Sequence, residues 1–328
     1  MRFSEVLEIK NGKNQRQVEN PNGKYPIYGS GGVMGHADDY LCEAETVVIG
    51  RKGSINNPIF VEEPFWNVDT AFGLVANKDL LLPKYLYYFC INFNFEALNT
   101  TVTIPSLTKA NLLQIEINIP SIAEQSKVVS KLDKISKLIE LRKQQLEELD
   151  QLVKSRFIEL FDGKYETNPL QSVCEELFAG GDVKKDKYSD VQSEKNPYPI
   201  YTNGEKDNGL YGYTSIVRVV KEAVTISGRG TIGFTCLRKE PFYPAVRLIV
   251  AVPKQEMVSG CYLQHFIQSK NYGGQGASIP QLTVPMIKDE PIPVPPIELQ
   301  NQFSAFVEQV DKSKYYNQKT INIVPKQI

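Results

Sequence analysis

Histidine, which serves both in acid–base catalysis and as a metal ligand, is scarce in this chain. It has two histidines, His36 and His265, and five cysteines, none of them in a Cys-x-x-Cys spacing. A histidine-rich metal site is therefore excluded, and the cysteines lack the spacing of a zinc site. Any Ser-His-Asp triad would have to use one of the two histidines, which we expect to lie in a turn (His36) and in helix packing (His265). The sequence predicts no catalytic residue, no metal and no cofactor.

Basic residues beside glycines are the best candidates for binding chemistry. Glycine allows close approach of the backbone to a phosphate, and nearby guanidinium, amide and hydroxyl groups can donate hydrogen bonds to it. The chain has Arg-Lys-Gly-Ser in one place and Arg-Gly-Thr in another. The alternative is a hairpin turn with a solvated arginine. We predict phosphate or base contacts at Arg51, Lys52, Gly53 and Ser54, and at Arg229, Gly230 and Thr231.

Most of the chain is a tandem repeat. YPIY at Tyr25–Tyr28 recurs at Tyr198–Tyr201, and IPSLT at Ile104–Thr108 recurs as IPQLT at Ile279–Thr283. The offset stays between 173 and 177 residues and the order never changes, which chance matches would not do. The sequence therefore indicates a duplication. The other matched pairs are RKGSI with GRGTI, EPFW with EPFY, YLYYF with YLQHF, and IPSIAEQ with VPPIELQ.

The matched segments supply further candidate contacts. After YPIY the copies differ, so we expect the shared tyrosine to pack and the following Ser or Asn to hydrogen-bond to base edges. The I-P-x-L-T loops either contact DNA or cap turns, and the sequence does not choose between them. The candidates are Tyr28, Ser30, Ser106, Thr108, Lys109, Tyr201, Asn203, Gln281 and Thr283.

Each copy has the same predicted layout. Short β-branched and aromatic runs such as ETVVIG and RLIVAV, bounded by Gly, Pro and Asn, predict strands joined by turns. One helix follows in each copy, near Pro83–Phe95 and near Cys261–Lys270, and we expect its aromatic residues to be core. Each copy then ends in a helix entered through a proline, Pro120 or Pro296.

The helix predicted over residues 122–161 is the clearest element. It contains no Gly or Pro, and its apolar residues follow heptad spacing, with Arg142 as one polar position, which predicts a coiled coil. At a rise of 1.5 Å per residue, about 40 residues span roughly 60 Å. Such a helix is a rigid spacer. The predicted seam consists of Val128, Leu132, Ile135, Ile139, Leu146, Leu149, Val153 and Leu160, with Phe303, Phe306 and Val310 in the second helix.

The second terminal helix departs from the repeat. It begins with the same apolar spacing but continues into YYNQKTINIVPKQI, where Thr320, the isoleucines and Pro325 favour helix poorly. We therefore expect it to be short. Its entry, VPPIELQ, also lacks the Glu-Gln pair found at Glu124–Gln125.

These motifs resemble the specificity (S) subunit of a Type I restriction-modification enzyme over nearly the whole chain. The resemblance is carried by IPSLT…IEINIPSIAEQSKVVSKLDKI, by its echo IPQLT…EPIPVPPIELQNQF, and by the glycine turns beside basic residues. It implies an α+β fold with two tandem target recognition domains of mixed α/β type. Long helices separate them as an antiparallel coiled-coil spacer with pseudo-two-fold repetition. The expected segments are 1–121, 122–161, 162–296 and a short helix with a tail at 297–328.

The resemblance also implies function and partners. The family's chains read the two halves of a split target in double-stranded DNA and assemble with two methyltransferase (M) subunits and with restriction/translocase (R) subunits. No span of about 20 apolar residues and no secretory signal is visible, so we expect a cytoplasmic protein without a membrane partner. Because the net charge is only −1, any DNA-binding patch must arise from clustering in the fold.

Two alternatives stay open. The short second helix also suits an orphan or phase-variable, truncated specificity chain that acts as a DNA-binding module. A fused DNA methyltransferase or nuclease is disfavoured, because the nearest strings to its motifs, NNPIF at Asn56–Phe60 and LFAGG at Leu177–Gly181, do not fit a methyltransferase, and no spaced acids and lysine suit a nuclease.

Overall fold

A computed structural model describes residues 1–328 except 100–104, 164, 184, 271, 273–280 and 324–328. The predicted tail at 324–328, and Ile104, Ile279 and Pro280 of the I-P-x-L-T segments, lie outside the described residues. The chain divides into two compact units, Met1–Leu141 and Arg142–Ile328, and each is described by itself. We call residues 1–121 domain one and residues 162–296 domain two.

Domain one is built on a four-stranded antiparallel sheet whose strand order is β1-β7-β4-β5. The central strand β4 is buried along its whole length, as its sequence TVVIG requires of a strand covered on both faces. Helices α1, α2 and α3 contribute to the core with the sheet. A second sheet has the order β3-β2-β6. The elements are α1 (Phe3–Val6), β1 (Leu7–Asn11), β2 (Tyr25–Gly29), β3 (Gly32–Ala37), β4 (Thr46–Gly50), β5 (Ile59–Val61), β6 (Trp66–Asn67), β7 (Ala71–Ala76), α2 (Pro83–Asn92), η1 (Phe95–Leu98) and α3 (Lys109–Leu113).

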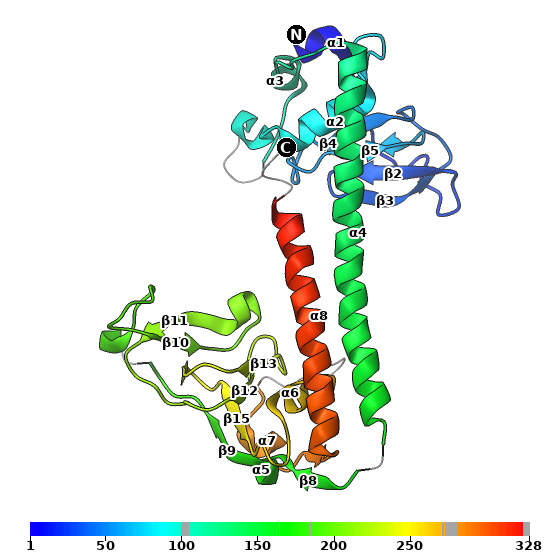
Figure 1. Ribbon diagram of the computed structural model, residues 1–328. Coiled ribbons are helices and arrows are strands. Elements are labelled where there is room, and N and C mark those ends of the chain that lie inside the picture. The colour runs from blue at the N-terminus through cyan, green and yellow to red at the C-terminus, as the bar shows by residue number, and fades with distance from the viewer. Residues whose placement is uncertain (100–104, 164, 184, 271, 273–280, 324–328) are drawn as a thin grey trace. The chain divides into compact units, whose positions relative to one another are not determined.

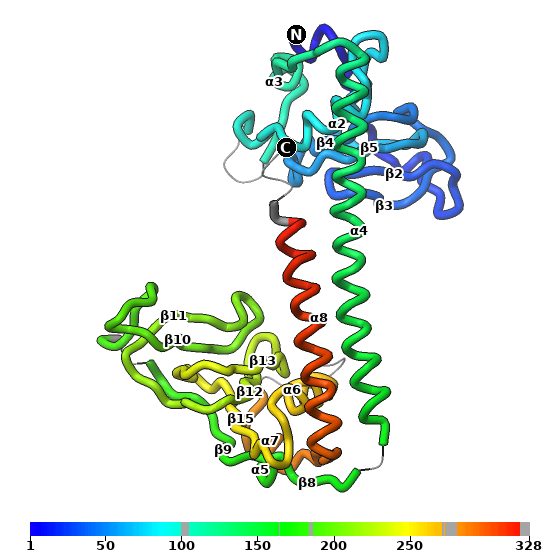
Figure 2. Tube along the Cα trace, viewed as in Figure 1, coloured from blue at the N-terminus to red at the C-terminus, as the bar shows by residue number. Residues whose placement is uncertain are grey.

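Domain two repeats the strand order of both sheets. Its sheets β9-β15-β12-β13 and β11-β10-β14 are those of domain one with each strand replaced by its counterpart, and a further two-stranded sheet pairs β16 with β8. The duplication read from the sequence therefore extends to strand order. Figure 2 shows the course of the chain from the N-terminus in blue to the C-terminal helix in red. The elements are β8 (Thr167–Pro169), α5 (Leu170–Val173), β9 (Cys174–Ala179), η2 (Lys185–Lys187), β10 (Tyr198–Tyr201), η3 (Lys206–Gly209), β11 (Leu210–Thr214), β12 (Ala223–Ile226), β13 (Thr235–Arg238), β14 (Tyr243–Pro244), β15 (Ile249–Pro253), α6 (Gly260–Ser269), α7 (Val284–Ile287) and β16 (Pro291–Pro293).

The expectation of a turn at His36 is wrong. His36 lies in β3 and is paired with Pro26 of β2. The sequence GVMGHA has a single β-branched residue, Val33, and lacks the alternation of a strand, so its conformation is set by pairing with β2 rather than by local preference.

The predicted helix over 122–161 is α4, Ile122–Phe161. Its start is fixed by Gln125, which is fully buried. Gln125 Oε1 accepts a hydrogen bond from the backbone N–H of Leu82 at 2.8 Å, and Nε2 donates to the carbonyls of Leu80 (2.8 Å) and Pro120 (2.9 Å). One amide therefore ties the first turn of α4 to the loop that opens α2.

The second terminal helix, α8 (Ile297–Ile323), uses the same device. Gln300 is fully buried, accepts from the N–H of Ser259 at 2.8 Å, and donates to the carbonyls of Met257 (3.0 Å) and Pro295 (2.8 Å). The second helix therefore lacks only the glutamate of the Glu-Gln pair, since Gln300 takes the place of Gln125. Glu124 is exposed and bonds Ser121 as a local cap, while the glutamine that anchors the helix is kept in both copies.

Within the second unit, α8 packs antiparallel to the C-terminal half of α4 (Figure 1). The ring centroids of Phe157 and Phe303 are 5.3 Å apart, and Arg142 Nη1 donates to Asn317 Oδ1 at 2.9 Å. The contact positions rise along α8 as they fall along α4, which confirms the antiparallel pair. Arg142, the polar position of the seam, is thereby matched with a polar residue that is 6% exposed.

The predicted seam is correct in part. Val153, Phe303 and Val310 are buried in the interhelical cluster, and Leu149, Leu160 and Phe306 pack against it. Leu132, Ile135, Ile139 and Leu146 are partly buried. Val128 is 39% exposed, so its assignment to the seam is wrong. At this end of α4 the buried Gln125 and domain one, rather than the heptad, decide which face is covered.

The second helix is shorter than the first, as expected, with 27 residues against 40 in α4, but the stretch that favours helix poorly is helical. α8 remains helical to Ile323, through Thr320 and the residues with poor intrinsic helix preference. Packing overrides that preference, because Asn317 lies in the interface with α4 and Lys314 Nζ lies 2.5 Å from Asp150 Oδ1.

His265 packs in this unit as the sequence predicts. Its ring lies 5.0 Å from that of Phe303 and 6.2 Å from that of Phe157, and Nδ1 is 2.9 Å from the carbonyl of Cys261. Burial lowers the pKa of His265 below its ordinary value, and the hydrogen bond to Cys261 opposes this only in part. A depressed pKa in the folded state means that the unfolded chain binds the extra proton more readily.

We therefore expect the second unit to lose stability as the pH falls through the ordinary histidine value of about 6.5 toward the lower folded-state pKa. Replacement of His265 by phenylalanine should make the unfolding midpoint less dependent on pH between about 7.5 and 5.5. Urea unfolding followed by circular dichroism would measure it. An identical pH dependence in both proteins would exclude His265 as its source.

Candidate nucleic-acid interface

The Arg51–Ser54 turn of domain one follows β4 and is held by the I-P-x-L-T segment. The N–H of Leu107 donates to the carbonyl of Arg51 at 2.9 Å, and the N–H of Gly53 donates to the carbonyl of Pro105 at 3.1 Å. The turn residues are exposed, whereas Leu107 beneath them is buried. Two segments far apart in the sequence thus form one surface, and the buried leucine anchors it.

Domain two builds the equivalent turn in the same way. The N–H of Leu282 donates to the carbonyl of Gly228 at 2.8 Å, as Leu107 does to Arg51. Gly53 and Gly230 have φ values of +84° and +68°. Residues with a side chain rarely adopt this backbone conformation, so it favours glycine at this point of both turns. The glycine turn and its hydrogen bond with the I-P-x-L-T segment are therefore the same in both domains, and we call this backbone arrangement the frame. The side chains that it presents differ between the domains.

Three side chains of domain two form a basic cluster on this frame. Arg229 donates to Gln281 Oε1 through Nε (3.2 Å) and Nη2 (2.9 Å), and Arg247 Nη1 donates to the same oxygen at 3.0 Å. Both arginines are exposed, and neither has a carboxylate partner among the described residues. One neutral amide oxygen therefore holds two guanidinium groups together without cancelling their charge.

Arg247 was missed at the sequence level. It precedes β15, has a left-handed backbone (φ +63°), and occupies the place that Thr70 has in domain one. The signal available was a basic residue just before a hydrophobic strand, which is too common to single out. Only the fold brings it to Gln281.

Domain one has basic residues at the same place, but fewer hydrogen bonds hold their side chains. Arg51 Nη1 lies 3.5 Å from the carbonyl of Asp69, and its guanidinium lies 5.8 Å from the centroid of the Phe72 ring. Lys52 is exposed, and its backbone is paired with that of Ser106. The described residues give neither cation a carboxylate partner. Two positive charges are therefore exposed here, although no side chain accepts hydrogen bonds from both of them as Gln281 does in domain two.

The hairpin turns after YPIY lie against the same frame. A Cβ built on Gly53 would lie 3.7 Å from Ser30 Oγ, so this serine borders the Arg51–Ser54 turn. In domain two, Asn203 Oδ1 accepts from the N–H of Gly228 at 2.7 Å and Nδ2 donates to the carbonyl of Val246 at 2.9 Å. The amide of Asn203 thus links the residues that precede Arg229 and Arg247.

Four predicted contacts have structural partners instead. Tyr28 packs edge-on to Phe65 with its pKa raised by burial, and Tyr201 is 8% exposed with its hydroxyl 2.5 Å from Glu240 Oε1. Thr108 Oγ1 caps α3 by accepting from Asn111 at 3.2 Å, and Lys109 Nζ donates to the carbonyl of Ile9 at 2.7 Å. We do not retain these four side chains as DNA contacts, because burial or an internal partner occupies each. Thr283 precedes α7 without a capping bond and stays a candidate.

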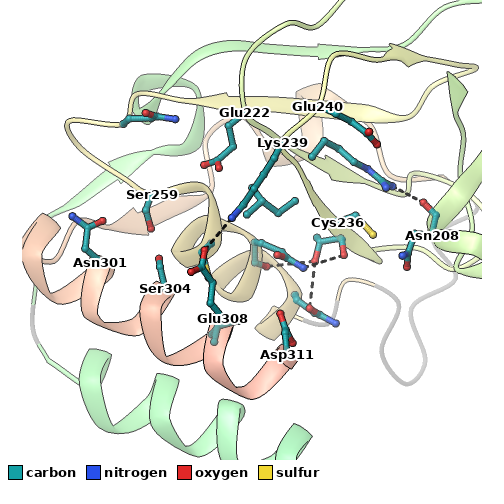
Figure 3. Close-up of a pocket in the computed structure, with 18 of the residues that line it drawn as sticks. Asn208, Glu222, Cys236, Lys239, Glu240, Ser259, Asn301, Ser304, Glu308 and Asp311 are labelled. Carbon is teal, nitrogen blue, oxygen red and sulfur yellow. Dashed lines mark hydrogen bonds and ion pairs between the residues drawn. The ribbon is translucent and has the colours of Figure 1, made fainter. Parts of the chain in front are cut away.

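A groove of about 1340 Å³ lies elsewhere in the second unit, between the edge strand β13, α6 and α8 (Figure 3). Its charges are largely neutralised by one another, as in Lys239 with Glu308 at 3.2 Å and Lys314 with Asp150. Among the described residues no group of three or more His, Cys, Asp or Glu is placed to hold a metal. In the same part of the chain, no helix is long and apolar enough to span a membrane. The groove is therefore a weaker candidate for binding a polyanion than the arginine cluster.

Comparison with known proteins gives the family of this chain. Residues 1–151 and 163–325 match the family described as Type I restriction modification DNA specificity domain. S.MpnORF507P of Mycoplasma pneumoniae, whose name classes it as a type I specificity subunit, is 25% identical over 325 residues, covering 94% of this chain and 87% of that protein. The structure of a type I S subunit from M. genitalium superimposes with a TM-score of 0.66 at 17% identity, over 99% of this chain and 92% of the other. A chain from a structure on assembly of the type I system gives 0.63 at 15% identity, over 100% and 94%.

The two matched regions correspond to the two copies of the repeat and together cover nearly the whole chain. The solved structures, at their low identity, support the fold alone, which is the predicted pair of mixed α/β domains with long helices. The chain belongs to the family of type I restriction-modification DNA specificity proteins.

Proposed function

We propose that this chain is the DNA-recognition subunit of a type I restriction-modification system and that each domain reads one half of a bipartite duplex target. The observation that carries the proposal is the Arg229–Gln281–Arg247 cluster. Guanidinium groups bind phosphate oxygens or the O6 and N7 of guanine through paired hydrogen bonds. Two of them, exposed and held by one amide, are preorganised for such a ligand.

The difference between the domains supports two different half-sites. On the duplicated frame, Lys52 takes the place of Arg229, Ser106 that of Gln281, and Ser30 that of Asn203. The hydrogen-bonding groups presented to a base edge are therefore not the same, and base edges in the major groove are distinguished by such groups. The proposed contacts are Ser30, Arg51, Lys52, Gly53, Ser54 and Ser106 in domain one, and Asn203, Arg229, Gly230, Thr231, Arg247, Gln281 and Thr283 in domain two.

The same proposal assigns catalysis to partner subunits. Large apolar side chains face outward on α4, including Leu152 (48% exposed) and Ile158 (63% exposed), and such surfaces mark interaction sites. We propose that the paired helices dock two methyltransferase subunits and, through the assembled complex, the restriction/translocase subunits. The chain itself then supplies no catalytic group and acts in the cytoplasm, where these partners and DNA are found.

Substitution of Arg229 by alanine is expected to weaken binding to the cognate duplex by about 1–3 kcal/mol and to relax one base of the second half-site, if the guanidinium reads a base. If it holds a phosphate, affinity should fall for all sequences and the salt dependence should lose about one unit of slope. Binding would be measured by fluorescence anisotropy over a salt series.

Arg218 offers a matched control, because its charge is already paired with Glu176 at 2.7 Å. Arg218→Ala should leave affinity nearly unchanged. The complete proposal is tested by mapping sequence-specific adenine methylation with methyltransferase subunits supplied. Sequence-specific binding without methylation would favour an orphan DNA-binding module, and methylation by the chain alone would favour a fused enzyme.

A further inference from the structure

The two domains differ in length at the turn that follows YPIY. In domain one, β2 and β3 are joined tightly, with Gly29 paired to Gly32. In domain two, the last paired residues of β10 and β11 are Tyr201 and Leu210, so residues 202–209 form a longer connection. We call residues 204–209 the insert loop. Its residues 205–208 have no counterpart in domain one.

The insert loop has a defined and unusual backbone. Asp207 and Asn208 are both left-handed, with φ of 49° and 52°, and the flanking Gly204 and Gly209 have φ of 121° and 79°. Consecutive left-handed residues other than glycine are uncommon and persist only where the surroundings impose them. Here the N–H of Gly204 donates to Ser227 Oγ at 3.1 Å, and the N–H of Thr202 donates to the carbonyl of Gly209 at 2.8 Å.

A buried arginine holds the insert loop through a hydrogen bond to its backbone. Arg238, at the end of β13, is 7% exposed and its guanidinium lies 3.6 Å from the centroid of the Tyr201 ring. Nη2 donates to the carbonyl of Asn208 at 2.5 Å, the contact drawn as a dashed line at Asn208 in Figure 3, and Nε donates to Thr225 Oγ1 at 3.1 Å. The equivalent position on the edge strand of domain one is Val61, which is buried. The buried arginine and the inserted residues therefore occur together in domain two, and domain one has neither.

The loop lies beside the arginine cluster. Ser227, which accepts from Gly204, comes two residues before Arg229. Asn203, which precedes the loop, forms hydrogen bonds with Gly228 and Val246, the residues preceding Arg229 and Arg247. The side chains of Lys206 and Asp207 are exposed, and neither forms an ion pair within the described residues. Asp207 is thus an exposed carboxylate, without an ion-pair partner among the described residues, in a loop that adjoins the arginine cluster. Such a group is poorly suited to a surface that only contacts phosphate, since phosphate repels it.

We propose that the insert loop is a second base-reading element of domain two, with Asp207 accepting a hydrogen bond from the N4 amino group of a cytosine. A carboxylate is the acceptor that suits this group. Lys206 contacts the neighbouring phosphate, and Arg238 is a positioning residue that holds the loop through Asn208. This inference rests on the proposed function and gives the second half-site one read base pair for which domain one has no equivalent element.

The test compares wild-type protein with Asp207→Asn in binding to duplexes that carry every single-base change in the mapped target. We expect Asp207→Asn to lose about tenfold or more of its discrimination at one C·G pair of the second half-site, while the first half-site is unaffected. Deletion of residues 205–208 leaves Gly204 and Gly209 adjacent, like Gly31 and Gly32 of domain one, and should relax the same position. Arg238→Met should relax it too, a readout that a purely structural role would not confine to one base pair.

Glu205→Gln is the matched control, since it changes a neighbouring carboxylate of the same loop and should leave discrimination intact. If wild-type protein reads a bipartite target and Asp207→Asn discriminates equally well at every position, the inference is overturned and the proposed function stands. If wild-type protein reads no target while Arg229→Ala leaves its DNA binding unchanged, the proposed function fails and the inference fails with it.

Discussion

Replacement of Gln300 by leucine is expected to lower the unfolding free energy of the second unit by about 3–5 kcal/mol. The substitution leaves the N–H of Ser259 and the carbonyls of Met257 and Pro295 without their partner in a fully buried place. Each buried group left unsatisfied costs about 1–3 kcal/mol. The amide also joins α8 to the start of α6, so its loss should free the helix from its domain rather than disturb one contact.

The corresponding change at Gln125 should act on the first unit alone. The single tryptophan, Trp66, lies in that unit and is 7% exposed, so its fluorescence reports unfolding there. We expect Gln125→Leu to shift the urea midpoint of Trp66 fluorescence strongly. Gln300→Leu should instead shift the circular dichroism signal of helices and leave the Trp66 midpoint close to that of wild type.

Gln302→Leu is the matched control, because Gln302 is exposed on the same helix two residues from Gln300. It should change stability by less than about 0.5 kcal/mol. Equal destabilisation by Gln302→Leu and Gln300→Leu would show that added surface hydrophobicity, not the buried amide, causes the effect.

The elements with strong local signals could be predicted from the sequence. α4 ends where its uninterrupted heptads end, and strands β4, β12 and β15 coincide with β-branched runs. The repeat supplied a second, independent signal, because each weak motif occurs twice. It also singled out Arg51–Ser54 and Ser106 as separate candidates, and the structure pairs the backbone of Lys52 with that of Ser106.

What could not be predicted depends on tertiary contacts. Arg247 is an ordinary residue before a strand until the fold brings it to Gln281. The tyrosine of YPIY recurs because it packs, and in domain two Arg238 and Glu240 bury it completely enough to exclude a base contact. The C-terminal part of α8 has poor intrinsic preference and is helical because Asn317 meets Arg142 across the helix pair.

The Arg142–Asn317 pair gives a way to change the DNA target through the spacer. Seven residues inserted in phase between Leu146 and Leu149 keep the apolar stripe of α4 and lengthen it by about 10 Å. Alone, this insertion carries Arg142 two turns away from Asn317 while Asp150 stays beside Lys314. A second insertion of seven residues between Tyr315 and Tyr316 moves Asn317 by the same distance and restores the pair.

If α4 sets the separation of the two recognition domains, the doubly extended protein should keep both half-sites and read a target whose central gap is wider by about three base pairs. That number follows from 10 Å divided by the roughly 3.4 Å rise of B-DNA. The added length also rotates one half-site by about a third of a turn, which the helix pair must absorb, so activity should fall while both half-sites are still recognised. Genome-wide mapping of methylated sites would measure the gap.

The single insertion in α4 is the first control. We expect it to widen the gap at lower stability. Arg142 then loses its hydrogen bond to Asn317 and keeps the one to Gln145, at a cost of about 1.5–3 kcal/mol. Paired insertions of four residues are the second control. They rotate the apolar stripe out of the seam and should abolish methylation through loss of helix packing. An unchanged gap in the doubly extended protein at full activity would mean that α4 does not set the distance between the half-sites.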